Sequence, residues 1–307
     1  MKIFTHNEYS PLRSIIVGSA EQSSWPTNDL AFDNAIRSST FEGVLLPGPL
    51  PKQVTEEATE DLSALVDILE KENVKVYRPK ITSPNRSYSA RDILLTVGNR
   101  IIECPTAYSS RANEAELYPY LRSFDCEWIQ APRPVSKDDP QFDAANICKF
   151  DDKLLYLVSS TGNRAGAEWL QQQVGTDFEV VVWEGVYAFA HIDSTISSLN
   201  KDTILLNGSR VTEDDVPKFL KGHQKIWVND MVARDFHQFP FASKWIGMNV
   251  LSINPETVIV DSIQKGLIEQ LIEAGLQVIK TPLRHSRTLG GGFHCVTLDL
   301  QREHTPD

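Results

Sequence analysis

Acidic side chains and a histidine stand at similar places along this chain, each just before a pair of β-rich runs. Asp92 and Asp143 precede two of these pairs, and His191 and Asp193 precede a third. A histidine beside an acid is a usual arrangement for proton transfer near neutral pH. A single aspartate at such a place is more often the cap of a turn. The repetition of the position favours one shared site instead.

The spacing of His191 and Asp193 predicts that the two side chains share one face of a strand, because side chains alternate along a strand. Such a face could bind a metal ion or hold an acid–base pair. A buried histidine satisfied by a neighbouring carboxylate explains the same pattern equally well.

Three consecutive glycines precede the fourth cysteine of the chain, in GGGFHC at residues 290–295. Glycines leave the backbone exposed and allow a ligand to approach it closely. A phosphate-binding loop would need a helix and a lysine after the glycines, but a β-rich run follows here. Cys295 is therefore a candidate nucleophile, with a buried core thiol as the alternative. The remaining cysteines, Cys104, Cys126 and Cys148, lie in apolar runs and are expected in the core.

A zinc site is a weaker alternative. His191, Asp193, His294 and Cys295 have the right chemistry, but their spacing matches no compact pair of zinc ligands. On a strand, His294 and Cys295 would also point to opposite faces. We therefore expect no metal and no other cofactor.

The elements that must position these residues form a repeat. Two β-rich runs joined by a turn recur with turns near residues 99, 152, 201 and 255, about 50 residues apart. A helical pattern and a further strand follow each pair, and residues 14–77 form a looser copy. The helices are expected at 55–71, 111–121, 163–174, 212–220 and 262–274. Five such ββαβ units without polar end caps favour a closed ring over a linear stack.

Composition limits the possible functions. The net charge is −11, and no apolar run approaches the length of a membrane span, so neither nucleic acid nor a membrane is an expected partner. The first residues lack the pattern of a signal peptide, and four cysteines make no disulfide framework. The expectation is a cytoplasmic α/β protein with one domain over residues 1–307 and a frayed tail at 301–307.

The chain resembles the glycine amidinotransferase family of the guanidino-group-modifying enzymes. Six blocks carry the resemblance: EYSPLRSIIVG at 8–18, RDILLTVGN at 91–99, FDAA at 142–145, HIDST at 191–195, SKW to MNV at 243–250, and LGGGFHC at 289–295. The resemblance implies a five-bladed, pseudo-symmetric α/β propeller of ββαβ modules with the site on its axis. It implies small-molecule substrates, and a homodimer is one of the oligomeric states that the family allows.

The resemblance also implies roles for individual residues. Cys295 matches the nucleophile and His191 the general acid–base. Asp143 and Asp193 match the carboxylates that hold the guanidinium of arginine. Such a pair would neutralise the cation and fix its plane. Asp92 matches a position near the substrate α-amino group.

Two further positions match the amino-acid end of the substrate. Arg210 matches the arginine that binds the α-carboxylate, and Ser243 matches one of two adjacent serines. The other serine is Ala242 here. Asn146 stands where the family often has an aspartate, so one formal charge is missing.

The entrance to the site is also expected to differ. In the glycine-using relatives, the positions of Ala188 and Ala190 carry Asn and Met. Two alanines would widen the mouth above Cys295 and favour an acceptor larger than glycine, unless the segment at 33–42 fills the space.

The resulting expectation is an enzyme that moves the amidino group of L-arginine through Cys295 to a primary amine and releases L-ornithine. A guanidino-group hydrolase of the arginine deiminase or dihydrolase type is the close alternative. A non-catalytic propeller that binds arginine or a protein is the alternative from another class, and a metal hydrolase is a third.

Overall fold

The computed structural model describes residues 1–30, 32–33, 48–233 and 242–304. Within these ranges the chain forms five separate three-stranded sheets and one two-stranded sheet, β2 (Ser24–Trp25) with β3 (Gly48–Pro49). In each three-stranded sheet the first strand runs antiparallel to the second, and the second runs parallel to the third. The repeat that the sequence predicts is therefore present.

Four of these sheets are contiguous in the sequence, and their hairpins turn where the sequence predicts. Their strands are β5 (Leu94–Val97), β6 (Arg100–Glu103) and β7 (Glu127–Gln130); β8 (Ile147–Phe150), β9 (Lys153–Leu157) and β10 (Glu179–Trp183); β11 (Ile196–Asn200), β12 (Thr203–Asn207) and β13 (Gln224–Val228); and β14 (Leu251–Asn254), β15 (Thr257–Asp261) and β16 (Gln277–Thr281).

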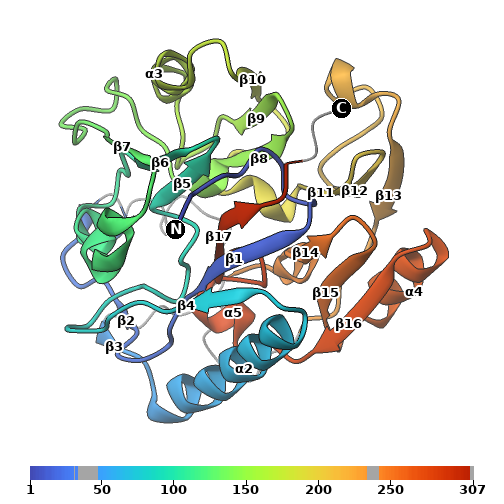
Figure 1. The fold of residues 1–307 in the computed structure, drawn as a ribbon, viewed down its shortest axis with the longest axis horizontal. Helices are drawn as coiled ribbons and strands as arrows, with labels where there is room; N and C mark the ends of the chain where they lie inside the picture. Colours follow the sequence, from blue (N-terminus) through green and yellow to red (C-terminus); the bar gives the residue numbers. More distant parts are fainter. Residues whose placement is uncertain (31, 34–47, 234–241, 305–307) are drawn as a thin grey trace.

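The fifth sheet joins the two ends of the chain. Strand β17 (Thr297–Arg302) pairs with β1 (Leu12–Val17), which pairs with β4 (Lys75–Tyr77). In Figure 1 the red, blue and cyan strands lie side by side. The prediction of a frayed tail from residue 301 is wrong, because Arg302 is paired with Leu12 and buried. The looser first copy is explained in the same way, since its first strand comes from the C-terminal end.

The connections between the second and third strands are helical in three of the five sheets. These helices are α2 (Lys52–Lys71), α3 (Arg164–Val174) and α4 (Lys265–Glu273), and a short α5 (Ser286–Leu289) precedes the glycine loop. The helices predicted at 111–121 and 212–220 are wrong. The structure has 3-10 turns there, because Pro119 and Pro217 each disfavour an α conformation in the preceding residue.

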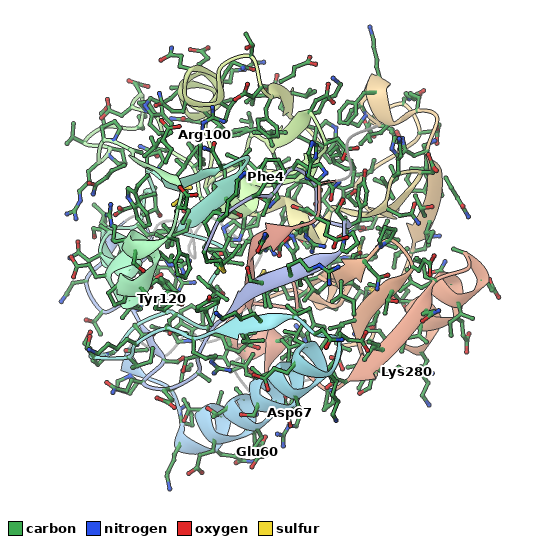
Figure 2. The ribbon with its side chains drawn as sticks, viewed as in Figure 1. Phe4, Glu60, Asp67, Arg100, Tyr120 and Lys280 are labelled. Carbon is green, nitrogen blue, oxygen red and sulfur yellow. The ribbon has the colours of Figure 1, made fainter. Side chains whose placement is uncertain are left out.

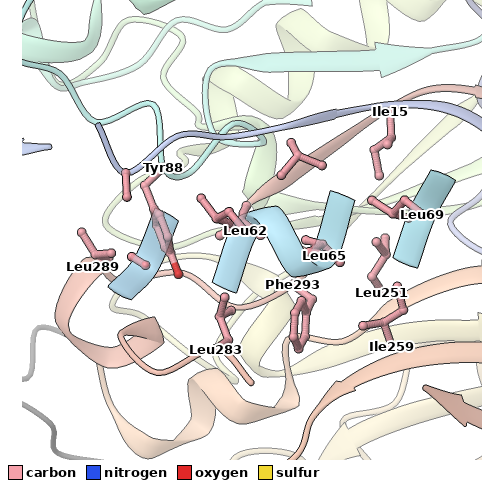
Figure 3. Close-up of a cluster of buried hydrophobic side chains, with 14 of the residues drawn as sticks. Ile15, Leu62, Leu65, Leu69, Tyr88, Leu251, Ile259, Leu283, Leu289 and Phe293 are labelled. Atoms are coloured by element: carbon pink, nitrogen blue, oxygen red, sulfur yellow. The ribbon is translucent and has the colours of Figure 1, made fainter. Parts of the chain in front are cut away.

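Buried apolar clusters join the sheets in pairs. Among the described residues there are five, and each combines side chains from two three-stranded sheets. The pairs, named by first strands, are β17 with β5, β5 with β8, β8 with β11, β11 with β14, and β14 with β17. Figure 3 shows the last pair, where Leu62, Leu65 and Leu69 of α2 pack against residues that include Leu251 and Ile259. Each sheet thus contributes to two clusters.

Charged side chains such as Glu60 and Asp67 of α2 and Lys280 of β16 lie on the outer surface (Figure 2). No helix in the described ranges has the length and apolar character that a membrane span requires. The segment at 33–42 is expected as a possible filler of the entrance to the site. Of this segment, only Asp33 falls within the described residues.

Candidate active site

The five three-stranded sheets carry a polar or reactive residue at the same place, within four positions of the start of the first strand. These residues are Asp92, Asp143, Asp193, Asn249 and Cys295. The sequence predicts the three aspartates at equivalent positions. Asn249 was missed, although its place just before the fourth hairpin is the signal that would have found it. Since β17 is the first strand of the fifth sheet, Cys295 takes the same place as the aspartates.

Cys295 is buried and held by two neighbours. Asn249 accepts a hydrogen bond at Oδ1 from the Cys295 amide, at 2.8 Å, and its Nδ2 donates to Sγ at 3.2 Å. The thiol in turn donates to Oδ2 of Asp193 at 3.0 Å. Both the backbone and the sulfur of Cys295 are therefore fixed, with a carboxylate directly against the sulfur.

The glycine loop allows this close packing. A Cβ on Gly292 would lie 2.4 Å from the Cβ of Asn249, so a side chain there would displace the residue that holds Cys295. Gly290 has φ +74°, a conformation that favours glycine. The sequence suggests that these glycines admit a ligand. The close approach that the structure shows at Gly292 is instead to the side chain of Asn249.

His191 lies between two of the aspartates. Its Nε2 is 3.0 Å from Oδ2 of Asp143, a hydrogen bond, and its Nδ1 is 3.8 Å from Oδ1 of Asp92. The strand predicted at His191 and Asp193 is wrong, because residues 192–194 form a 3-10 turn that His191 precedes. The turn nevertheless brings both side chains into one charged cluster, where His191 contributes to lowering the pKa of Asp193.

Two buried carboxylate oxygens at this site, Oδ1 of Asp92 and Oδ1 of Asp143, have no hydrogen-bond partner among the described residues. The other oxygen of Asp92 is ion-paired with Arg111, which also contacts Glu114 at 2.7 Å. Sequence reasoning missed Arg111, which lies in a segment expected to be an ordinary helix. A buried charged oxygen without a donor is unfavourable. Both oxygens flank His191 and would be satisfied by a cation with several N–H donors.

His294 also contacts the site, contrary to the expectation that it points away from Cys295. The backbone turns at 293–296, so both side chains reach Oδ2 of Asp193, with Nδ1 of His294 at 3.3 Å. On its other side, Nε2 of His294 lies 3.2 Å from Oε2 of Glu8. No group of three or more His, Cys, Asp or Glu side chains in the described ranges has the geometry of a metal site.

The electrostatics of the two reactive groups differ. Burial raises the pKa of the Cys295 thiol well above its ordinary value, and the charges of Asp193 and Asp92 raise it further. Burial opposes a charge on His191, but Asp92 and the hydrogen bond with Asp143 together raise its pKa to about 9. At neutral pH without substrate, Cys295 is therefore a thiol and His191 an imidazolium.

Arg210 and Ser243 are the residues expected at the amino-acid end of the substrate. Arg210 lies over the ring of Tyr187 at 3.6 Å, and its Nη1 donates to Ser194 and Thr195. Ser243 is exposed and precedes a 3-10 turn at residues 244–248.

The residues around the expected entrance have small side chains that are exposed or half-buried. Ala188 is exposed and Ala190 is half-buried, and Ala188 accepts a backbone hydrogen bond from Ser160 at 2.8 Å. Beside Ser243, Ala242 makes a backbone hydrogen bond with Arg287 at 2.8 Å.

Asn146 serves the fold. Its Nδ2 donates to the carbonyl of Leu157 and to Ser159, and its Oδ1 accepts from Thr161. Its polar atoms therefore bond to protein groups, and a neutral side chain stands where the family often has a charged aspartate.

Comparison with known proteins gives consistent relatives. An inosamine-phosphate amidinotransferase of Streptomyces glaucescens is 37% identical over 98% of this chain and 97% of the relative. An L-arginine:L-lysine amidinotransferase of Pseudomonas savastanoi pv. phaseolicola is 28% identical over 98% of this chain and 94% of the relative. The solved inosamine-phosphate amidinotransferase of Streptomyces griseus is 36% identical, with a TM-score of 0.90 over 99% of this chain and 98% of that one. No protein-family model matches the chain.

Five three-stranded sheets of one topology, with a cysteine, a histidine and aspartates before their first strands, define an α/β protein of the pentein class. The chain belongs to the amidinotransferase family of this superfamily.

Proposed function

We propose that this protein transfers the amidino group of L-arginine, through a covalent intermediate on Cys295, to a primary amine larger than glycine. The observation that carries the proposal is the pair of carboxylate oxygens on Asp92 and Asp143 that find no hydrogen-bond partner in the described part of the chain. They lie in a cluster that also contains Asp193 against the Cys295 sulfur. A guanidinium is planar, cationic and rich in N–H donors, so it satisfies such oxygens.

The fold that supports this site is a five-bladed α/β propeller forming a single domain over residues 1–307. Two features support this arrangement: the common topology of the five sheets, and the chain of apolar clusters that links each sheet to the next and the last to the first. In such a ring, residues before the first strands converge on the axis.

In the first half-reaction, Sγ of Cys295 as thiolate attacks the central guanidinium carbon of arginine. The bond from this carbon to the δ-nitrogen breaks, and His191 gives its proton to that nitrogen, so that ornithine leaves as an amine. The carbon remains bonded to Sγ as an amidino-cysteine. His191 is suited to this role because its raised pKa keeps it protonated at neutral pH.

In the second half-reaction, the acceptor amine attacks the amidino carbon and loses a proton to His191. The C–S bond breaks, and its electrons return to Sγ as the thiolate. The product carries the guanidino group, and His191 is again protonated. No cofactor takes part in this scheme.

Substrate binding would activate the thiol. Two negative carboxylates raise the pKa of Cys295, and a guanidinium placed between them brings a compensating positive charge. The thiol then releases its proton to solvent, and the thiolate forms where its attack is needed. Free Cys295 stays protected as a thiol.

The geometry favours a different role for Asp92 from the one implied by the resemblance. Its Oδ1 lies 3.8 Å from His191, at the reacting end of the site, and its other oxygen is held by Arg111. We therefore assign Asp92 and Asp193 to the guanidinium. Asp143 orients His191 through Oδ2, and its Oδ1 remains available to the substrate.

Arg210 and Ser243 are assigned to the amino-acid end of arginine. Arg210 is anchored through Nη1 to the segment that carries Asp193, so its other two guanidinium nitrogens have defined positions relative to the site. This cation would bind the α-carboxylate.

The acceptor is proposed from the small side chains at Ala188 and Ala190 and from the similar proteins. Those relatives are named for an inosamine phosphate and for lysine, both larger than glycine. Amines of these two kinds are the first candidates.

The test is incubation of the purified protein with L-arginine and an amine panel of inosamine phosphate, lysine and glycine, with products read by mass spectrometry. Ornithine and a guanidinylated amine in equal amounts are expected. Citrulline, or urea with ornithine, would assign the protein to the hydrolases instead.

A companion measurement addresses the nucleophile. Intact-mass analysis with arginine alone should show an amidino adduct on the wild type and none on Cys295→Ala, which should also lose turnover. Retention of half the activity by Cys295→Ala would overturn the proposal.

A further inference from the structure

A second buried histidine–carboxylate pair stands behind the nucleophile. His294 and Glu8 are both buried, and their Nε2 and Oε2 atoms are 3.2 Å apart, an ion-pair distance without hydrogen-bond alignment. The opposite ring nitrogen of His294 contacts Oδ2 of Asp193, the oxygen that accepts from the Cys295 thiol. Four side chains from three distant parts of the chain are therefore linked by successive contacts, in the order Glu8, His294, Asp193 and Cys295.

We propose that His294 and Glu8 are positioning residues that hold the Asp193 carboxylate against Cys295 and offset its charge, so that they set both the reactivity of the thiol and the binding of the guanidinium. The inference rests on the proposed roles of Cys295 and Asp193. The inference gives a function to Glu8, which has no role in the two half-reactions proposed above.

The geometry limits how Asp193 can move. Its Oδ2 has both His294 and Cys295 as partners, and the ring of His294 is held at its far nitrogen by Glu8. Glu8 is held in turn, since its Oε1 accepts from the Lys149 amide at 3.3 Å. Without His294 the Asp193 carboxylate would stay beside the sulfur, because Cys295 still donates to its Oδ2, but its orientation toward the guanidinium would no longer be fixed.

The charges around His294 favour its protonated form. Burial and the guanidinium of Arg91 oppose it, but Glu8 and Asp193 together raise the pKa of His294 above its ordinary value. Arg91 also donates to the His294 carbonyl at 2.8 Å, which fixes the backbone of the turn. Glu8 is ionised, because burial is outweighed by His294, Arg91 and Lys149, which lower its pKa to about 2.

The sign of the expected effect follows from this balance. The positive charge of His294 offsets that of Asp193, and Asp193 is a cause of the raised pKa of Cys295. Removing the imidazolium therefore raises the pKa of Cys295 further and slows its alkylation at a fixed pH. Glu8→Gln removes one of the two groups that raise the pKa of His294, so the imidazolium fraction falls and the change has the same direction.

The experiment measures two quantities on each variant: the rate of Cys295 alkylation by iodoacetamide at pH 7.5 without arginine, and the KM and kcat for arginine. The alkylated Cys295 peptide is quantified by mass spectrometry. His294→Leu and Glu8→Gln should each slow alkylation at least threefold and raise the KM for arginine at least tenfold.

His294→Asn should restore part of both, because its side-chain amide can donate to Asp193 from the place of Nδ1. Glu57→Gln is the matched control. Glu57 is also paired with a buried histidine, His285, at 2.7 Å, but within the described part of the chain that pair does not contact Asp193 or Cys295. It should leave both quantities unchanged.

Circular dichroism and melting curves identify variants that fail to fold. Glu8→Gln keeps the side-chain volume and an acceptor oxygen for the Lys149 amide. If His294→Leu does not fold, Glu8→Gln therefore tests the inference, and His294→Asn is a second variant that does so. Folded Glu8→Gln with wild-type alkylation and wild-type KM would overturn the inference. A purely structural role would lower the melting temperature and the active fraction without moving KM. Failure of the proposed function itself is distinct, because it would appear as hydrolysis products from arginine or as retained activity of Cys295→Ala, whatever the alkylation rates.

Discussion

Asn249 holds Cys295 at two atoms, accepting from its backbone amide at 2.8 Å and donating to its sulfur at 3.2 Å. The two residues occupy equivalent places in the fourth and fifth sheets, and 46 residues separate them in the chain. If Cys295 is a thiolate, Nδ2 of Asn249 still donates a hydrogen bond to its sulfur, which stabilises the charged form. The asparagine thus both orients the nucleophile and favours its reactive state.

Asn249→Ala should therefore lower kcat by about 10- to 100-fold, because a nucleophile without its supports is displaced from the attack geometry. The alanine keeps the Cβ against which Gly292 packs, so the fold should persist. Steady-state kinetics with arginine as the varied substrate measure the effect. Asn254→Ala is the control, since the Asn254 side chain accepts from the Glu256 amide in a turn, and it should have wild-type kcat. Equal kcat values for the two variants would contradict the role of Asn249.

Without substrate, the thiol of Cys295 should lose its proton only at high pH. Burial and the charges of Asp193 and Asp92 raise the pKa of Cys295 well above its ordinary value, so its thiolate fraction grows only at high pH. Without arginine, the alkylation rate of Cys295 should still be rising at pH 9. Asp193→Asn should shift the profile to lower pH, since it removes one of the charges that disfavour the thiolate, while it weakens arginine binding. A wild-type plateau below pH 8 would show that the thiol is already activated without substrate.

The ion pair of Arg111 with Asp92 should be important for stability as well as for the site. Arg111, Asp92 and Glu114 are buried, so Arg111→Met leaves two buried carboxylates without their cation. Breaking such a pair typically costs about 3–5 kcal/mol. Urea denaturation should show a loss of this size for Arg111→Met.

The control for this measurement is Lys52→Met, which breaks the exposed pair with Glu56 and should change the free energy of unfolding by less than about 1 kcal/mol. A loss below 1 kcal/mol for Arg111→Met would mean that Asp92 and Glu114 adopt their positions without it.

The sequence predicts the parts of this fold that depend on local pattern. Alternation and turn residues locate the four contiguous hairpins, and the apolar periodicity locates α3, which begins after Asn163, whose side chain accepts from the Gly166 amide. The equivalent positions of Asp92, Asp143 and Asp193 are also visible, because they depend on the repeat alone.

The remaining features depend on long-range pairing. The partnership of Leu12 with Arg302 joins residues from the two ends of the chain, so nothing local near Arg302 distinguishes a strand from a tail. The contact of His294 with Asp193 depends on a turn rather than a strand at 293–296. Glu8 reaches His294 from the segment before β1, which the Lys149 amide of β8 holds. Contacts of this kind are set by the assembled sheets.

Acceptor choice should respond to two side chains at the entrance. Ala188 is exposed and Ala190 half-buried, and both are smaller than the Asn and Met expected in glycine-using relatives. The space left by these small side chains would remain empty around glycine but would be filled by a longer or cyclic amine. Each buried methylene contributes about 0.8 kcal/mol, which is about a fourfold gain in kcat/KM. At fixed arginine, inosamine phosphate or lysine should therefore exceed glycine in kcat/KM by at least tenfold. The double variant Ala188→Asn, Ala190→Met should narrow this ratio by lowering kcat/KM for the large amines, while the KM for arginine serves as the control and stays constant. Glycine emerging as the best acceptor of the wild type would show that these two positions do not set the size of the acceptor pocket.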